Sequence, residues 1–227
     1  MPGEALPDNQ PMAPSDVAAG GDMAAGGKAV VVLATGNRHK LREIAAMVRG
    51  EPFALVGLDS FPGIVLPPET GETFEENAIG KATAVCARTG LVAIADDSGL
   101  EVDSLGCRPG VLSARFAGPE SDDQANVRLL LKLMESIPDD RRSARFVCAL
   151  AIAAPNGRVE VVRGSCEGRI TRAERGQSGF GYDPVFEIPA DGRTLAEFSS
   201  SEKNAISHRF RAIAAALPLI REVREEE

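Results

Sequence analysis

The 227-residue chain lacks an excess of positive charge: it has 25 Lys and Arg residues against 33 Asp and Glu residues, a formal net charge of −8. General binding to nucleic acids needs a basic stripe that neutralises phosphates, so we expect no nucleic-acid partner. Nor does the chain contain an apolar run that approaches the roughly 20 residues needed to cross a bilayer, so we expect no membrane association. A small phosphate ligand stays possible, because a few local Lys and Arg groups suffice for it.

The sequence also lacks closely spaced cysteines of the metal-binding type, and two of its cysteines lie in apolar patterns typical of reduced core thiols. The four are Cys86, Cys107, Cys148 and Cys166. Residues 1–27 lack the basic start and apolar middle of a signal peptide and show no periodicity, which predicts a disordered extension. We therefore expect a cytoplasmic protein with one domain over residues 28–221 and a charged tail over residues 222–227.

Apolar runs typical of buried strands alternate with helical periodicity along the rest of the chain. The expected strands cover residues 29–34, 53–58, 91–95, 145–154, 159–163 and 185–188. The expected helices begin at Asn37, Thr73 and Ser121 and stop near Gly50, near Gly90 and before Pro138. Strand pairs interleaved with helices indicate an α/β or α+β domain with a mixed sheet.

The segment that follows the first strand, Thr35-Gly36-Asn37-Arg38-His39-Lys40, has the features of an anion site. A strand, a glycine turn and a helix start direct free backbone N–H groups and the helix dipole at one point. Lys40 would then reach a bound anion from the first helical turn. The spacing is not that of a Walker A loop, and an ordinary strand-to-helix joint has the same pattern, so this segment alone leaves both interpretations open.

A second segment, Asp96-Asp97-Ser98-Gly99, ends the apolar run at residues 91–95. We expect the strand to end in a turn at Gly99, with Glu101–Leu105 returning as a hairpin partner. Adjacent carboxylates disfavour double ionisation unless a divalent cation or a Lys and Arg cluster lies beside them. Taken alone, the segment is more typical of a simple capping turn. Glu69, which lies in a loop, is the best candidate for a further acid at such a site.

Two late segments complete the candidate site. In Gln177–Pro184, glycines flank aromatic residues, which is typical of a plain loop or of a wall on which a base stacks. In Ser199–Arg209, one continuous helix would direct its basic residues apart. We therefore predict a break near Ser207, which places His208 and Arg209 in the first turn of the final helix; a solvated helix start remains the alternative.

These segments together resemble the inosine triphosphate pyrophosphatase family, in the family's order and over nearly everything from residue 29 to 217. The matching stretches are Thr35–Lys40, Glu69–Gly71, Thr73–Ala78, Asp96–Gly99, Phe180–Asp183 and Glu202–Arg209. The resemblance implies an elongated mixed sheet in two α/β lobes with a cleft between them, and usually a homodimer. It also implies Mg²⁺-dependent hydrolysis of ITP, dITP and XTP to the monophosphate and pyrophosphate, which keeps deaminated purines out of nucleic acids.

The resemblance further assigns roles to individual residues. Asp97 and Glu69 would bind Mg²⁺, Asp97 would act as the general base, and Lys40 would stabilise charge on the phosphates. The implied substrate-binding residues are Thr35, Gly36, Asn37, Arg38, His39, Lys40, Ser98, Phe180, Gly181, Tyr182, Asp183, Lys203, His208 and Arg209. Two alternatives stay open: a catalytically silent nucleotide-binding module, and a pyrophosphatase for another altered nucleotide.

Overall fold

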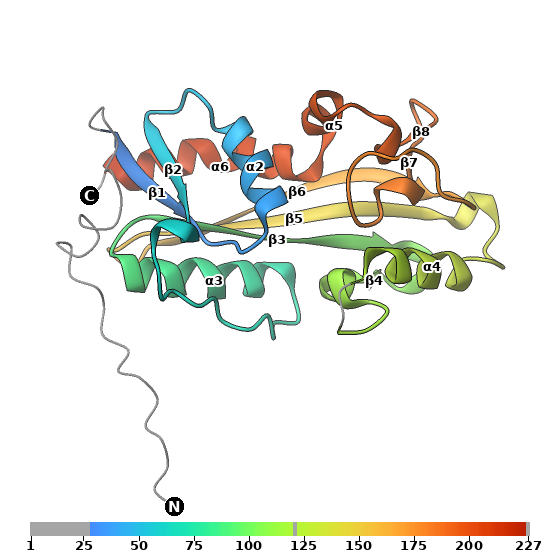
Figure 1. Cartoon of the computed structure of the whole chain (residues 1–227), viewed down its shortest axis with the longest axis horizontal. Coiled ribbons are helices and arrows are strands. Elements are labelled where there is room, and N and C mark those ends of the chain that lie inside the picture. Colours follow the sequence, from blue (N-terminus) through green and yellow to red (C-terminus); the bar gives the residue numbers. More distant parts are fainter. Residues whose placement is uncertain (1–27, 120–121, 226–227) are drawn as a thin grey trace, which may run out of the picture.

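The structure, a computed structural model, describes residues 28–119 and 122–225. Its centre is one mixed eight-stranded sheet in the order β2-β1-β3-β5-β6-β7-β8, with β4 paired to β3 (Figure 1). The strands are β1 Ala29–Leu33, β2 Phe53–Gly57, β3 Ala93–Val102, β4 Arg108–Pro109, β5 Ser143–Ala153, β6 Val159–Ile170, β7 Phe186–Ile188 and β8 Arg193–Thr194. Strand β1 is parallel to β2 and β3, and the remaining pairs are antiparallel. The predicted mixed α/β fold is confirmed.

Helices cover both faces of this sheet (Figure 1). Helices α3 and α4 lie on one side, and α2, α5 and α6 lie on the other. Their bounds are α2 Arg38–Met47, α3 Phe74–Thr89, α4 Asp123–Leu133, α5 Ser200–Ile206 and α6 His208–Glu225. Within the described ranges, no helix is both long and apolar enough to cross a membrane.

The buried apolar side chains form three clusters. Two of them lie on opposite faces of the sheet, because side chains alternate along a strand. One cluster lies between the sheet and helices α2 and α6, and a second lies between the sheet and α3. The third is centred on residues such as Leu130, Phe146 and Phe186, at the other end of the long strands. Strands β3, β5 and β6 run through both ends, so two lobes share one sheet (Figure 1).

Local capping signals fix most helix starts as predicted. The side chain of Asn37 accepts from the N–H groups of His39 (2.8 Å) and Lys40 (3.3 Å). Thr73 accepts from Glu76 N (3.1 Å), but the Glu76 carboxylate accepts from Glu72 N (2.7 Å). Glu76 therefore closes the loop before α3 by bonding one residue further back than a capping box requires.

Two predicted boundaries differ from the structure, and a third falls outside the described residues. Helix α4 begins after Asp122, whose carboxylate caps it, while the expected start Ser121 lies outside the described residues. The expected tail at residues 222–227 begins inside α6, because Val223 is buried and extends the apolar face of that helix; residues 226–227 are outside the description. The predicted extension, residues 1–27, also lies outside the described residues.

The turn predicted at Gly99 is wrong, because β3 continues through Val102. Around Gly99 its partner is β5, which pairs Asp97 with Ala149 and Gly99 with Val147. Glu101 and Val102 are the end of β3 itself, so Glu101–Leu105 is not a separate hairpin partner. A Cβ at Gly99 would meet the Ser113 hydroxyl, and it would lie 2.6 Å from Gly110 O and 2.8 Å from the Phe74 ring. Gly99 is therefore required for close packing in mid-strand rather than for a turn.

We expect Gly99→Ala to lower the free energy of unfolding by about 2 kcal/mol, because the added methyl group overpacks this site. The matched control is Gly80→Ala in α3, where a Cβ meets nothing within 4 Å. This control should be neutral or raise stability by up to about 1 kcal/mol, since alanine favours helix. Chemical denaturation measures both, and equal stabilities for the two variants would refute the packing role of Gly99.

Candidate functional site

A cavity of about 540 Å³ lies between the two lobes. Every predicted site residue lines it except Arg38, whose side chain is exposed in the first turn of α2. The predicted residues on its walls are Thr35, Gly36, Asn37, His39, Lys40, Glu69, Asp97, Ser98, Phe180, Gly181, Tyr182, Asp183, Lys203, His208 and Arg209. Segments more than 100 residues apart thus converge on one space.

The strand–helix joint contributes the anion-attracting wall of the cavity. It holds the end of β1, the turn at Thr35 and Gly36, and the N-terminus of α2. The Thr35 hydroxyl accepts from Asn37 N (3.2 Å), which fixes the turn. Lys40 then projects from the first helical turn into the same space. Helix dipole and ammonium group together favour a negatively charged ligand here.

The adjacent acids of β3 project to opposite faces of the sheet because side chains alternate along a strand. Asp96 faces α2 and α6, where Lys40 Nζ lies 2.9 Å from its Oδ2. Asp97 faces α3, where its Oδ2 accepts from Asn77 Nδ2 (2.9 Å). The charge repulsion expected between neighbouring carboxylates is therefore reduced by geometry, and each acid has its own partners.

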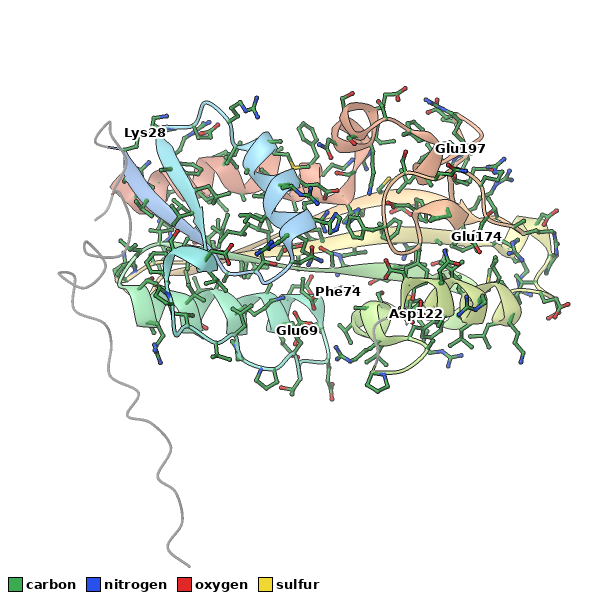
Figure 2. The ribbon with its side chains drawn as sticks, viewed as in Figure 1. Lys28, Glu69, Phe74, Asp122, Glu174 and Glu197 are labelled. Carbon is green, nitrogen blue, oxygen red and sulfur yellow. The ribbon has the colours of Figure 1, made fainter. Side chains whose placement is uncertain are left out.

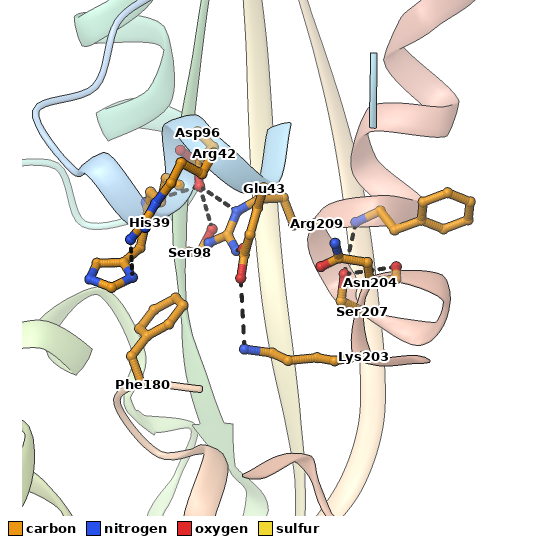
Figure 3. Close-up of polar contacts among 12 residues, drawn as sticks. His39, Arg42, Glu43, Asp96, Ser98, Phe180, Lys203, Asn204, Ser207 and Arg209 are labelled. Atoms are coloured by element: carbon orange, nitrogen blue, oxygen red, sulfur yellow. Dashed lines mark hydrogen bonds and ion pairs between the residues drawn. The ribbon is translucent and has the colours of Figure 1, made fainter. Parts of the chain in front are cut away.

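Asp96 is the centre of a buried ionic network (Figure 3). Its Oδ2 accepts from Ser98 Oγ (2.8 Å) and lies 3.4 Å from Arg209 Nε, in addition to the Lys40 contact. Burial raises the pKa of Asp96, but the charges of Lys40 and Arg209 outweigh that effect and hold the pKa below its usual range. Asp96 is 1% exposed, so this carboxylate orders the cavity wall rather than meeting solvent.

Glu43 of α2 extends the network toward the other end of the cavity (Figure 3). Its carboxylate binds Arg209 Nη1 and lies 3.8 Å from Lys203 Nζ. Lys203 in turn lies 2.6 Å from Asp183 Oδ2. No sequence pattern singles out Glu43, because on α2 alone it is one more charged residue.

Asp97 and Glu69 form the acidic part of the cavity, and Lys81 lies beside them. Burial raises the pKa of Asp97 above its usual value, although Lys81 and the Asn77 amide oppose the shift. Lys81 Nζ binds the Glu69 carboxylate and donates to Asp96 O (2.8 Å). Lys81 was not predicted, yet a signal existed: this lysine falls on the apolar face of α3, seven residues after Phe74.

Aromatic and basic groups line the opposite end of the cavity. The Phe180 ring lies 5.7 Å from the His39 ring and 4.7 Å from Lys203 Nζ. His208 stacks on Phe146 with a centroid distance of 5.0 Å, and burial together with Arg209 and Lys203 lowers its pKa well below the usual value. His208 is therefore a neutral ring near pH 7.

Tyr182 has a structural part in this wall. Its hydroxyl donates to Ser113 O (2.8 Å), and the side chain is buried. The carboxylate of Asp183 accepts from Phe180 N (2.9 Å) as well as from Lys203. Ser207 caps α6 by accepting from Phe210 N (3.1 Å), so the helix break predicted there is confirmed.

The acidic part of the cavity suits a hard divalent cation that takes some of its ligands from the protein and the others from a substrate and water. Among residues 28–119 and 122–225, no group of three or more His, Cys, Asp or Glu side chains is arranged to hold a metal alone. Glu69 and Asp97 nevertheless line one cavity, and Glu69 is close enough to raise the pKa of Asp97. Mg²⁺ typically takes one or two carboxylates and completes its shell with water and phosphate oxygens.

The fold and cavity thus define an α/β protein whose interlobe cleft offers a polyanion site, a pair of carboxylates and an aromatic wall. The family model described as the Ham1 family matches residues 31–219. The chain belongs to the Ham1 family.

Individual relatives are similar over most of the chain. A dITP/XTP pyrophosphatase of Desulforamulus reducens is 49% identical over 190 residues, which is 84% of this chain and 94% of the relative. One of Symbiobacterium thermophilum is 51% identical over 196 residues, 86% of this chain and 97% of the relative. The solved structure of a HAM1 protein from Coxiella burnetii has a TM-score of 0.79 at 40% identity, covering 86% of this chain and 99% of that one. The solved structure of a nucleoside-triphosphatase/dITP/XTP pyrophosphatase from Mycobacterium abscessus has a TM-score of 0.71 at 47% identity, covering 83% of this chain and 99% of that one.

We expect Asp96→Asn to lower the free energy of unfolding by about 3 kcal/mol near pH 7, because the half-buried Lys40 and the buried Arg209 lose their shared partner. The folded pKa of Asp96 lies below the unfolded one, so its contribution is fully present above about pH 4 and is lost as pH falls through the folded pKa. The difference in free energy of unfolding between the wild type and Asp96→Asn should therefore shrink in acid.

Denaturant unfolding of both proteins between pH 7 and pH 3 measures this prediction. The exposed Asp59 provides the control, since Asp59→Asn should change stability by less than about 0.5 kcal/mol at any pH. If the loss of unfolding free energy caused by Asp96→Asn stayed constant from pH 7 to pH 3, titration of Asp96 would be excluded as its cause.

Proposed function

We propose that the protein is a nucleoside-triphosphate pyrophosphatase that hydrolyses dITP, ITP and XTP to the monophosphate and pyrophosphate, excluding deaminated purines from DNA and RNA. The observation that carries the proposal is the convergence on one cavity of Lys40, the pair Glu69 and Asp97, and the wall at residues 180–183. The dITP/XTP pyrophosphatases that share about half of the sequence support the same activity.

The cavity has two chemically distinct ends, which orient the substrate. We assign the triphosphate to residues 35–40, where the start of α2 and Lys40 attract negative charge. We assign the purine to the opposite end, where Phe180 offers a ring for stacking. Lys40 and the helix N-terminus then lie where they stabilise charge that develops on the phosphates during cleavage.

We assign the chemical step to Asp97, with Glu69 and Lys81 in support. Glu69 and Asp97 would hold Mg²⁺, which when bound offsets triphosphate charge and lowers the pKa of the attacking water. Asp97, whose carboxylate lines the cavity beside Glu69, then accepts the proton of that water. Lys81, anchored on Asp96 O, orients the Glu69 carboxylate.

Base selection follows from the donors at the purine end. Arg209 uses Nε for Asp96 and Nη1 for Glu43, so we assign Nη2 to the 6-oxygen of hypoxanthine or xanthine. An adenine presents its 6-amino donor to the same group, which leaves two donors facing each other in a buried site. A mismatch of this kind gives strong discrimination.

A panel of nucleotides tests the proposal directly. With Mg²⁺ present, release of pyrophosphate should be at least about 100-fold more efficient from dITP, ITP and XTP than from ATP, as expected when a buried polar pair is mismatched. Tight binding of ITP without turnover would favour a nucleotide-binding module instead. Preferred turnover of dUTP or another altered nucleotide would favour a different pyrophosphatase.

We expect Asp97→Asn to reduce kcat for ITP by at least about 1,000-fold, because the general base and one carboxylate of the cation site are both lost. Glu69→Gln should also lower kcat for ITP sharply, because the other carboxylate of the cation site is lost. The matched control is Glu72→Gln, which alters an exposed acid three residues away that does not line the cavity. Thermal unfolding verifies that all three variants are folded, and near-normal turnover by folded Asp97→Asn would remove Asp97 from the mechanism.

We further propose, from the family resemblance, that the protein is cytoplasmic and homodimeric, and that the residues from 28 to the end of α6 form one functional unit. Sedimentation velocity tests the dimer: a single species at about the monomer mass across micromolar concentrations would contradict it.

A further inference from the structure

A second cavity, of about 280 Å³, lies at the end of the second lobe. It is formed by the end of β6, the loop at residues 171–175 and β7; Figure 2 marks this end of the molecule by Glu174. None of its lining residues lines the interlobe cavity. Four of them are arginines: Arg142, Arg169, Arg172 and Arg175.

The carboxylates that line this cavity do not balance its arginines. Glu187 is shared by two of them: Arg169 Nε lies 2.6 Å from Oε1, and Arg175 Nη2 lies 2.6 Å from Oε2. Asp139 accepts from Arg172 Nε (2.8 Å). The lining groups therefore carry four positive and two negative charges in a chain whose net charge is −8. Glu197, outside the lining, lies 3.6 Å from Arg175 Nε, so the four arginines of the lining are paired with three carboxylates.

Arg142 shows that part of this charge is buried without a carboxylate hydrogen-bonded to it. The residue is 3% exposed, and its guanidinium donates only to backbone carbonyls: Ile170 O (2.7 Å), Met134 O (2.5 Å), Ile137 O (3.3 Å) and Thr171 O (2.8 Å). Burial and the charge of Arg172 lower the pKa of Arg142, and the charge of Asp139 opposes the shift. Because the lining holds more arginines than carboxylates and one of these cations is buried, the cavity has an electrostatic reason to bind an anion.

We propose that this cavity binds a small oxyanion of the phosphate class, inorganic phosphate or pyrophosphate. Planar guanidinium groups match the geometry of phosphate oxygens and bind them in pairs of hydrogen bonds. Arg169, Arg172 and Arg175 are each about half exposed, so an ion can reach them from solvent. Pyrophosphate is a product of the proposed reaction, whereas phosphate is not. Titration with each anion separately shows which of the two the cavity binds.

Isothermal titration calorimetry of the full chain without divalent metal, at constant chloride ionic strength, tests the site with phosphate and pyrophosphate separately. We expect Arg172→Gln to weaken binding about tenfold, because one charged donor is lost. Asp139→Asn should tighten binding about threefold, because it removes a competing carboxylate and releases Arg172. The matched control is Arg221→Gln, which removes an equally charged and similarly exposed arginine paired with Glu51 elsewhere.

Opposite shifts for Arg172→Gln and Asp139→Asn, with the Arg221→Gln control unchanged, would support the site. Equal affinity in all four proteins would place the binding in the interlobe cavity and overturn the proposal, as would the absence of binding to the wild type. Turnover of ITP by Arg172→Gln should equal that of the wild type, so failure of this site is distinguishable from failure of the proposed activity.

Discussion

The buried carboxylate of Asp96 is the constraint on which the rest of the site depends. It lies in the middle of a central strand, and its two cationic partners come from the first turns of α2 and α6. One of them, Lys40, lies at the end of the cavity that we assign to the triphosphate, and the other, Arg209, at the end that we assign to the purine. A single side chain thus sets the separation between the two cationic groups, and the geometry of the cleft follows from the register of β3 against its neighbours.

The alternation of β3 gives two successive acids two different environments. Asp96 is surrounded by cations, which keep its pKa low, whereas desolvation dominates at Asp97 and raises its pKa. The first carboxylate is therefore committed to holding the wall together, and the second stays available for chemistry. Two residues of the same type, one peptide apart, acquire separate tasks because a strand places them on opposite faces.

The extent of prediction from sequence depends on how local the determining interactions are. Caps such as Asn37 and the break at Ser207 are fixed by a few neighbouring atoms, and the patterns around them predicted both. The course of β3 through Gly99 was missed because it is set by pairing with β5, some fifty residues later. Arg209 was identified as a site residue, but its pairing with Asp96 and Glu43, 113 and 166 residues away, required the fold.

The pairing of Lys40 with Asp96 has a consequence for ligand affinity. A polyanion that enters the cleft meets an ammonium group that already has an anionic partner inside the protein, so its binding strength is the difference between two competing attractions. Such internal competition weakens the hold on any phosphate-bearing molecule, product as well as substrate. An enzyme that must discharge a pyrophosphate after each cycle gains from that weakness, because a fully unopposed lysine would retain the leaving anion.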